Sequence, residues 1–382
     1  MDDIAIIGAG QSAFSRSCGV SIRELCYDAF KEAFEGLNLK KDDIDASIIA
    51  SSPGYDKQRS PAGVISQYLG LTPMPTFSVE SICSSSTTGL RVGWSLIRAG
   101  LHKIVAVIGF QKMSEMTSRE VAEMMGRGSD LIWETPFGMT AATSYALCAQ
   151  AHMAEYGTTV EQLAKVRVKN SIYGARNPKA TYRKELTIEA VLNSEVVSSP
   201  IKKFDCCANA DGASCVILAR GDIATSVTKT PIWIIGLGAA TDTITMSQRQ
   251  TLTGFCSAKA AKEAYAMAAI KPEDVNVAEV HDAFTIAEII AYEDLGFAKP
   301  GEGSTLIDDK MTYLGGKIPV NIDGGLLSKG HPVGATGGSQ IRTIVRQLRG
   351  EALEAQVPNA EIGLVHNVGG TGYYSNVIIL RR

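Results

Sequence analysis

The sequence lacks the segments that a membrane or secreted protein needs. No apolar run approaches the ~20 residues of a membrane span. The N-terminus, Met1-Asp-Asp-Ile, has neither the basic start nor the apolar core of a signal peptide. Its eight cysteines show no CxxC pair and no regular spacing, which fits reduced thiols and argues against a disulfide framework or a zinc site. We therefore expect a cytoplasmic protein that binds no metal.

An excess of positive charge is also absent. Lys and Arg number 37 against 40 Asp and Glu, and the formal net charge is −3. Too few uncompensated cations are available for phosphate contacts, so we do not expect nucleic acid as a partner. With 382 residues, 45% of them hydrophobic, the chain is long enough for two core-bearing units.

Two halves of the chain repeat the same order of elements. Ile6-Ile-Gly-Ala-Gly10 recurs as Ile234-Ile-Gly-Leu-Gly238, an offset of 228 (234 − 6). In each half a predicted helix (22–34 and 258–269) leads to an apolar strand (46–50 and 277–280). This pattern predicts an internally duplicated α/β fold. We expect its halves to be residues 1–230 and 231–382.

The first glycine turn also matches the dinucleotide fingerprint GxGxxA, at Gly8 to Ala13. In that fingerprint a helix begins at once, whereas residues 13–20 are polar and irregular and the first helix pattern starts at Ile22. We therefore do not expect NAD to bind.

The regular alternation of strand and helix patterns is interrupted between about residues 111 and 203, which predicts an inserted loop region. It contains a cluster of methionines, which would pack internally or form a lid over an apolar acyl group; they are Met113, Met116, Met124, Met125 and Met139. It also contains a run of seven basic residues without an acidic one. That run could be a solvated face or a site for the phosphates of a nucleotide such as coenzyme A. Its members are Lys165, Arg167, Lys169, Arg176, Lys179, Arg183 and Lys184.

Cys83 is the first candidate for chemistry. Extended residues 77–80 lead into a turn at Cys83, and the helix-periodic segment 91–99 follows. A helix N-terminus favours the thiolate, which is the reactive form of cysteine. The structural alternative is a small buried cysteine at a strand-to-helix junction.

Three of the five histidines stand where strands end or glycines cluster. His281 begins His281-Asp-Ala-Phe284, His331 lies in Gly330-His-Pro-Val-Gly-Ala-Thr-Gly337, and His366 begins His366-Asn-Val-Gly-Gly-Thr-Gly372. Together with a helix-start cysteine they indicate a Cys/His nucleophilic site. His102 and His152 lie in helix-like contexts, and we interpret them as structural.

These motifs make the chain similar to the thiolase superfamily over essentially its whole length. Gly330-His-Pro-Val-Gly-Ala-Thr-Gly337 is specific for the superfamily. The motifs at His281 and His366 resemble the sterol-carrier-protein-type and archaeal acetyl-CoA acetyltransferase branch. The resemblance implies a five-layered αβαβα duplication. It also implies a CoA-dependent acyltransferase of lipid metabolism, with coenzyme A as a substrate and no tightly bound cofactor.

The resemblance assigns roles to four residues. Cys83 would take the acyl group as a thioester, His331 would activate it and help bind the thioester oxygen, and His281 would complete that oxyanion site. A second oxyanion hole would use the backbone N–H groups of Cys83 and Val368. Family members normally carry a second cysteine, but His366 and Ala283 occupy its two usual positions. Either His366 or His281 would then be the second acid/base.

The alternatives are a retro-aldolase or ketoacyl-synthase-type enzyme on the same fold, or a CoA-binding scaffold subunit without activity. By resemblance we expect a homodimer or a dimer of dimers. The resemblance also implies, as a further partner, a zinc-ribbon/OB-fold accessory subunit or a hydroxymethylglutaryl-CoA synthase. The apolar strand 76–79 beside Cys83 could form the edge that a dimer pairs.

Overall fold

A computed structural model describes residues 4–55 and 58–382. Within these ranges nine strands form one mixed sheet in the order β3-β2-β4-β7-β1-β8-β11-β10-β9. The strands are β1 (Ile4–Gln11), β2 (Ala46–Ala50), β3 (Thr76–Val79), β4 (Ile104–Gln111), β7 (Gly212–Arg220), β8 (Ile232–Thr241), β9 (Val277–Glu279), β10 (Ile362–Gly369) and β11 (Tyr374–Arg381); β5 (Val196–Ser198) and β6 (Ile201–Lys202) pair separately.

The predicted duplication is confirmed by the strand order. In the first half β2 runs parallel to β4, and β4, β7 and β1 then pair antiparallel. In the second half β9, β10, β11 and β8 repeat these relations. Within the sheet, the two halves join through β1 and β8, where Ala5 pairs with Trp233 and Ile6 with Ile232. The expected division at 230/231 falls just before β8.

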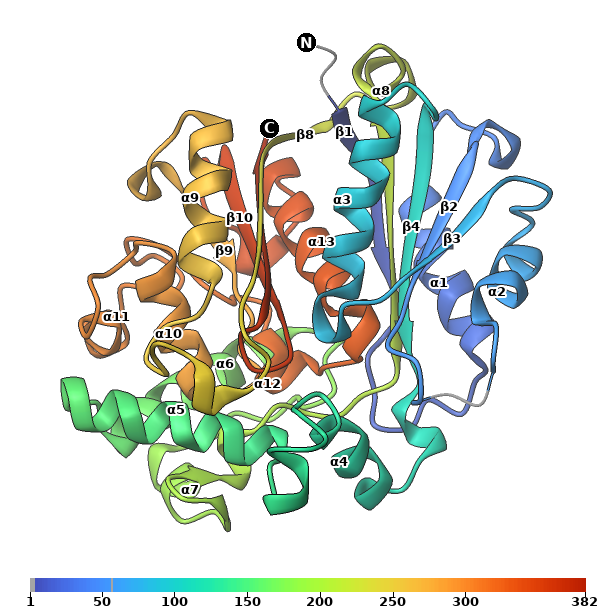
Figure 1. Cartoon of the computed structure of the whole chain (residues 1–382). Helices are drawn as coiled ribbons and strands as arrows, with labels where there is room; N and C mark the ends of the chain where they lie inside the picture. Colours follow the sequence, from blue (N-terminus) through green and yellow to red (C-terminus); the bar gives the residue numbers. More distant parts are fainter. Residues whose placement is uncertain (1–3, 56–57) are drawn as a thin grey trace.

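The two halves of the sheet form two layers, and helices form the other three (Figure 1). In the centre, α3 (Ser85–Arg98) and α13 (Thr336–Arg349) share one hydrophobic core with both halves of the sheet. On one outer face lie α1 (Ile22–Phe34) and α2 (Pro61–Leu69), with α8 (Gly221–Val227); on the other lie α9 (Ser257–Ala268) and α10 (Thr285–Asp294). This is the expected αβαβα arrangement.

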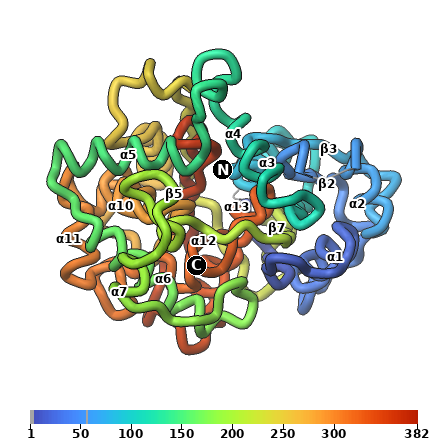
Figure 2. Tube along the Cα trace, turned by 90° about the horizontal axis from the view of Figure 1, so that it is seen from below, coloured from blue at the N-terminus to red at the C-terminus, as the bar shows by residue number. Residues whose placement is uncertain are grey.

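The segment between β4 and β7 is largely helical, whereas the sequence indicated a loop region. It contains α4 (Ser118–Gly126), α5 (Ala141–Tyr156), α6 (Val160–Arg176) and α7 (Ile188–Leu192). Seen from below, α5, α6 and α7 lie across the underside of the molecule (Figure 2). Two short helices, α11 (Gly303–Asp308) and α12 (Gly325–Lys329), complete the second half. No described helix is long and apolar enough to cross a membrane.

The two GxG motifs lie inside strands β1 and β8 and serve helix packing. A Cβ on Gly10 would lie 2.3 Å from the Ala29 carbonyl oxygen of α1, and one on Gly238 would lie 1.8 Å from the Ala260 carbonyl oxygen of α9. Each glycine therefore lets an outer helix approach its strand closely. This accounts for the repeated motif without a dinucleotide.

Candidate active site

Cys83 sits in a 3₁₀ turn, η2 (Ile82–Ser84), that runs directly into α3. Ile82 holds a positive φ of 51°, a conformation that non-glycine residues rarely adopt and that often marks a functional turn. The turn opens onto a cavity of about 890 Å³. The predicted position of Cys83 at a helix start is confirmed.

Burial raises the pKa of Cys83 to about 12, although the backbone N–H groups of Gly370 and of Cys83 itself act in the opposite direction. The side chain is therefore a neutral thiol, in contrast to the thiolate that the sequence led us to expect. Desolvation outweighs the helix terminus here, so a base must take the proton when substrate arrives.

The structure brings Cys83, His281 and His331 together. The Cys83 Sγ and one ring nitrogen from each histidine lie within 4.8 Å of one another. The two imidazole rings stand edge to face with centroids 5.2 Å apart. All three residues line the cavity, as predicted from their motifs.

His331 has an unprotonated ring nitrogen, Nε2, that can accept a proton. Its Nδ1 lies 2.7 Å from the Thr336 hydroxyl, and that hydroxyl donates its hydrogen to the Pro332 carbonyl oxygen at 3.0 Å. The hydroxyl must therefore accept from Nδ1–H, which leaves Nε2 unprotonated. Burial lowers the pKa of His331 to about 3, so the ring is a neutral base.

His281 has the opposite tautomer. The Asn367 amide nitrogen donates to its Nδ1 at 3.0 Å, and the Asn367 oxygen accepts from Thr87 at 2.9 Å. The neutral ring then carries its proton on Nε2, which is buried without a hydrogen-bond partner among the described residues. Burial, and then His331 and His366, lower the pKa of His281 well below its ordinary value. The site thus holds one acceptor and one donor.

Asp282 explains why the two histidine motifs meet. Its carboxylate accepts from the backbone N–H groups of Leu326 (2.6 Å) and Leu327 (3.2 Å) in the first turn of α12. This helix leads into Gly330 and His331, so Asp282 ties the loop of His281 to the loop of His331. Sequence reasoning did not assign a role to Asp282, Asn367 or Thr336.

Cys83 Sγ and the ring nitrogens of His281 and His331 lie close enough together to bind a metal ion, but their protonation states do not suit one. His281 turns a protonated nitrogen toward the cavity, and a protonated ring nitrogen has no lone pair for a metal. Only Cys83 and His331 would remain as ligands. An acceptor beside a donor fits covalent thioester chemistry better.

Two predicted site residues lie elsewhere. His366 is buried inside β10, with its Nε2 2.8 Å from the Ser257 hydroxyl of α9, and does not line the cavity. Strand alternation points it away from Asn367, which faces Thr87 of α3. Val368 is likewise buried in β10 and outside the lining, whereas the Gly370 N–H donates toward Cys83 Sγ.

The basic run is dispersed by the fold. Lys169 is fully buried in an ion pair with Glu288, and the buried Arg167 donates to Ser328 at 2.5 Å. Internal partners hold these two charges, so the prediction that they contact phosphates is wrong. Lys165 pairs with Asp308 and Lys179 with Glu32; Arg176, Arg183 and Lys184 are exposed.

The methionines divide between the two sequence-based interpretations. Met124 and Met125 line the cavity, while Met113 is buried against Tyr55 in a small core beside Cys83. All eight cysteines, each within the described ranges, are free. His152 is structural as predicted, buried in α5 between Thr158 and Glu293.

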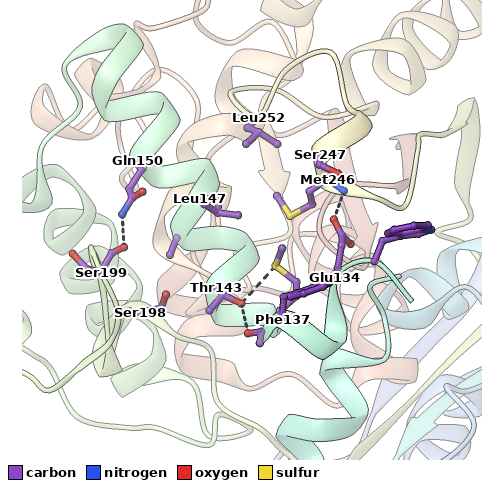
Figure 3. A pocket seen from close by; sticks show the side chains of 14 residues that line it. Glu134, Phe137, Thr143, Leu147, Gln150, Ser198, Ser199, Met246, Ser247 and Leu252 are labelled. Carbon is purple, nitrogen blue, oxygen red and sulfur yellow. Dashed lines mark hydrogen bonds between the residues drawn. The ribbon is translucent and has the colours of Figure 1, made fainter. Parts of the chain in front are cut away.

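A second hollow of about 490 Å³ lies beside α5 and has a different character (Figure 3). Trp133, Phe137, Leu147 and Leu252 line it, and Phe137 is 82% exposed. Its only charged lining residue, among those the structure describes, is Glu134, which accepts from the Met246 N–H at 2.6 Å. Among the described residues, no cysteine or histidine lines this hollow.

The family follows from two models that match nearly the whole chain. The thiolase N-terminal domain matches residues 4–222, and the thiolase C-terminal domain-like model matches residues 238–382. The chain belongs to the thiolase family. It is an enzyme of the acyltransferase class.

Individual relatives agree with the family. This thiolase is 40% identical to an acetyl-CoA acetyltransferase of Methanothermobacter thermautotrophicus, covering 100% of both chains. It is 30% identical to sterol carrier protein 2 of Homo sapiens, covering 96% of this chain and 70% of that protein. These relatives confirm the branch expected from the motifs.

Solved structures show the same fold. One described as an Ltp2-ChsH2(DUF35) aldolase has a TM-score of 0.87 at 25% identity, covering 100% of this chain and 98% of that one. Human mitochondrial 3-ketoacyl-CoA thiolase in complex with CoA has a TM-score of 0.78 at 16% identity, covering 100% and 98%. The second likeness concerns the fold alone.

Proposed function

We propose that this chain is a CoA-dependent thiolase. It would cleave a 3-oxoacyl-CoA with CoA, or run the reverse Claisen condensation, through an acyl-Cys83 intermediate. The observation that carries the proposal is the cluster of Cys83, His281 and His331 within 4.8 Å, with one nitrogen free to accept and one proton free to donate. The 40% identity to a protein named acetyl-CoA acetyltransferase supports it.

The residues divide the work as their hydrogen bonds suggest. His331 Nε2 takes the thiol proton of Cys83 as sulfur attacks the carbonyl carbon. His281 Nε2–H donates to the oxygen that gains charge when an enolate forms. The N–H groups of Cys83 and Gly370 would stabilise the tetrahedral oxyanion. Each such donor is typically worth ~3 kcal/mol in the transition state.

The cavity supports an acyl-CoA as the substrate. Met124 and Met125 form a flexible apolar wall that would face an acyl chain. The exposed Arg176, Arg183 and Lys184 remain candidates for the phosphates of CoA, which would act as a substrate without any tightly bound cofactor.

Intact mass spectrometry after incubation with acetyl-CoA tests the proposal. We expect one acyl adduct that disappears in Cys83→Ala. In His331→Ala the rate of Cys83 acylation should fall by ~10²–10⁴, because the base is removed. An adduct that persists in Cys83→Ala would move the nucleophile to another cysteine. A chain that never forms an adduct would favour the scaffold alternative.

A retro-aldolase is the second candidate, because one similar structure is described as an aldolase. Retro-aldol cleavage needs no acyl-enzyme, so the placement of Cys83 beside a free base argues against it. Consumption of free CoA separates the two, since only thiolysis uses it.

We also propose that the enzyme is a cytoplasmic homodimer, or dimer of dimers, in lipid metabolism. The edge strand β3 supports the dimer because Phe77 and Ser78 are exposed on it. An accessory zinc-ribbon/OB-fold subunit or a hydroxymethylglutaryl-CoA synthase would be a further partner. The description of one similar structure names a second component, ChsH2(DUF35).

A further inference from the structure

Breaking or forming a carbon–carbon bond needs a group that exchanges a proton with the α-carbon of an acyl-CoA, in addition to the base for Cys83. The three site histidines do not supply it. His331 Nε2 serves Cys83, His281 turns a proton toward oxygen, and His366 lies outside the cavity lining. The α-carbon therefore needs another partner.

Cys207 lies on a short segment held between the two histidine loops. Its backbone N–H donates to the Ala283 carbonyl oxygen at 2.9 Å, two residues after His281. The next residue, Ala208, accepts from the His331 N–H at 2.8 Å. Both catalytic loops thus fix the position of Cys207.

The pairing also sets the direction of the Cys207 side chain. Cys206 and Phe284 form an antiparallel bridge, so Cys207 stands opposite Ala283. Opposed residues of an antiparallel pair share one face, with Cβ atoms ~5 Å apart. Cys207, Ala283 and Cys83 all line the same cavity. The small Ala283 methyl leaves room for the thiol at this point.

The resting state of Cys207 suits a proton donor. Burial, followed by the neighbouring Cys206 and Cys83, raises the pKa of Cys207 well above its ordinary value, so the thiol is neutral. Tyr145 also lines the cavity, but its hydroxyl donates to the Gly370 carbonyl oxygen at 3.3 Å. A phenol is also a weaker acid than a thiol, with ordinary pKa values of ~10 and ~8.5.

We propose that Cys207 is a further catalytic residue, the one that exchanges a proton with the substrate α-carbon. The inference rests on the proposed thiolase function. In cleavage, the Cys83 thiolate adds to the 3-oxo carbon. The carbon–carbon bond breaks, its electron pair passes to the α-carbon of the leaving acyl-CoA, and this carbon takes the proton of Cys207 S–H.

The second half of the cycle restores both thiols. The Cys207 thiolate takes the proton from the incoming CoA thiol, and the CoA thiolate attacks the acyl-Cys83 thioester. The carbon–sulfur bond to Cys83 breaks, and the Cys83 thiolate recovers the proton that His331 had held. Condensation follows the same steps in reverse.

Deuterium exchange into acetyl-CoA tests this step without requiring full turnover. In D₂O, the wild-type chain should replace the methyl protons of acetyl-CoA by deuterium. Cys207→Ala and Cys207→Ser should form the Cys83 adduct as the wild type does, which also shows that they fold. Both should lose ~10²–10⁴ in the rate of exchange and of acetoacetyl-CoA thiolysis. Cys18→Ser, a partly buried thiol outside the cavity lining, should keep all three activities.

Three results would overturn the inference. A wild-type rate of exchange in both Cys207 variants would show that Cys207 does not transfer the proton. A wild-type rate in Cys207→Ser but not in Cys207→Ala would show that Cys207 only fills space. Loss of the adduct together with exchange would place Cys207 in the support of Cys83. A wild-type chain without any adduct would instead be a failure of the proposed thiolase function.

Discussion

His281 and His331 are the same residue type, and their second nitrogens make them different reagents. His331 donates through Nδ1 to Thr336, whereas His281 accepts through Nδ1 from Asn367. Each partner fixes the tautomer, and thereby decides whether Nε2 is an acceptor or a donor. The two residues that fix these tautomers, Thr336 and Asn367, lie outside the cavity lining.

Asn367→Asp should invert the tautomer of His281. A carboxylate accepts only, so Nδ1 would have to carry the proton and Nε2 would lose it. We expect kcat for acetoacetyl-CoA thiolysis to fall by ~10²–10³, the usual cost of one oxyanion donor. Asn376→Asp, on the neighbouring strand β11 and facing Thr88, is the matched control. A change below about threefold in Asn367→Asp would contradict this reading of the hydrogen bonds.

The pH dependence of acylation should reflect the buried state of His331. Its pKa of about 3 in the folded chain lies below the ordinary ~6.5, so the ring stays neutral as pH falls through 6.5. The rate of Cys83 acylation by acetyl-CoA should change less than about twofold between pH 7 and pH 5. A pH profile of the acylation rate with its midpoint near pH 6.5 would instead show that the base is exposed to solvent.

The low pKa of His331 also affects folding. As pH falls below ~6.5, the unfolded chain binds a proton at this histidine before the folded chain does, so the free energy of unfolding falls.

At the scale of elements, the two halves use the same turn–helix unit for different purposes. The turn η2 before α3 carries Cys83, and its counterpart η8 (Val333–Ala335) before α13 carries Gly334 at the matching position, an offset of 251 (334 − 83). A Cβ on Gly334 would lie 2.4 Å from the Phe110 carbonyl oxygen. One copy therefore presents a nucleophile, and the other packs against the opposite half.

Gly10→Ala should destabilise the first half. The new methyl would meet the Ala29 carbonyl oxygen at 2.3 Å and force α1 away from β1, at a cost of ~1–3 kcal/mol. Gly63→Ala in α2 is the control, because a Cβ there meets nothing within 4 Å and alanine favours a helix by ~1 kcal/mol. Thermal unfolding should show a lower Tm for the first variant and an equal or higher Tm for the second. A Tm for Gly10→Ala equal to that of the wild type would show that Gly10 is not needed for the packing of α1 on β1.

At the scale of the whole molecule, β3 is an edge with one unpaired side. The carbonyl groups of Pro75 and Val79 accept from β2, so by strand alternation the N–H of Ser78 points outward. This side of β3 is free for a second copy of the chain.

Ser78→Pro should therefore convert the dimer into a monomer. Proline removes the outward N–H but leaves the pairing with β2 intact. Light scattering during size-exclusion chromatography should give a dimer for the wild type and for Ser78→Ala, and a monomer for Ser78→Pro. A dimeric Ser78→Pro chain would place the interface elsewhere, and a monomeric wild type would remove the dimer.

The sequence alone determined the features that local patterns encode. The bounds of α1, β2 and β3 agree with the prediction because their apolar periodicity and flanking turns are local. The duplication and the cluster of Cys83, His281 and His331 were also predicted, since repeats and motifs survive in one dimension.

Only the tertiary structure decided which atoms face which. Burial set the neutral state of Cys83, the fold gave Lys169 and Arg167 internal partners, and strand alternation in β10 turned His366 out of the cavity. Gly370 and Cys207 reach the site through contacts with residues far away in the chain. Desolvation, ion pairing and side-chain direction depend on neighbours that sequence spacing does not specify.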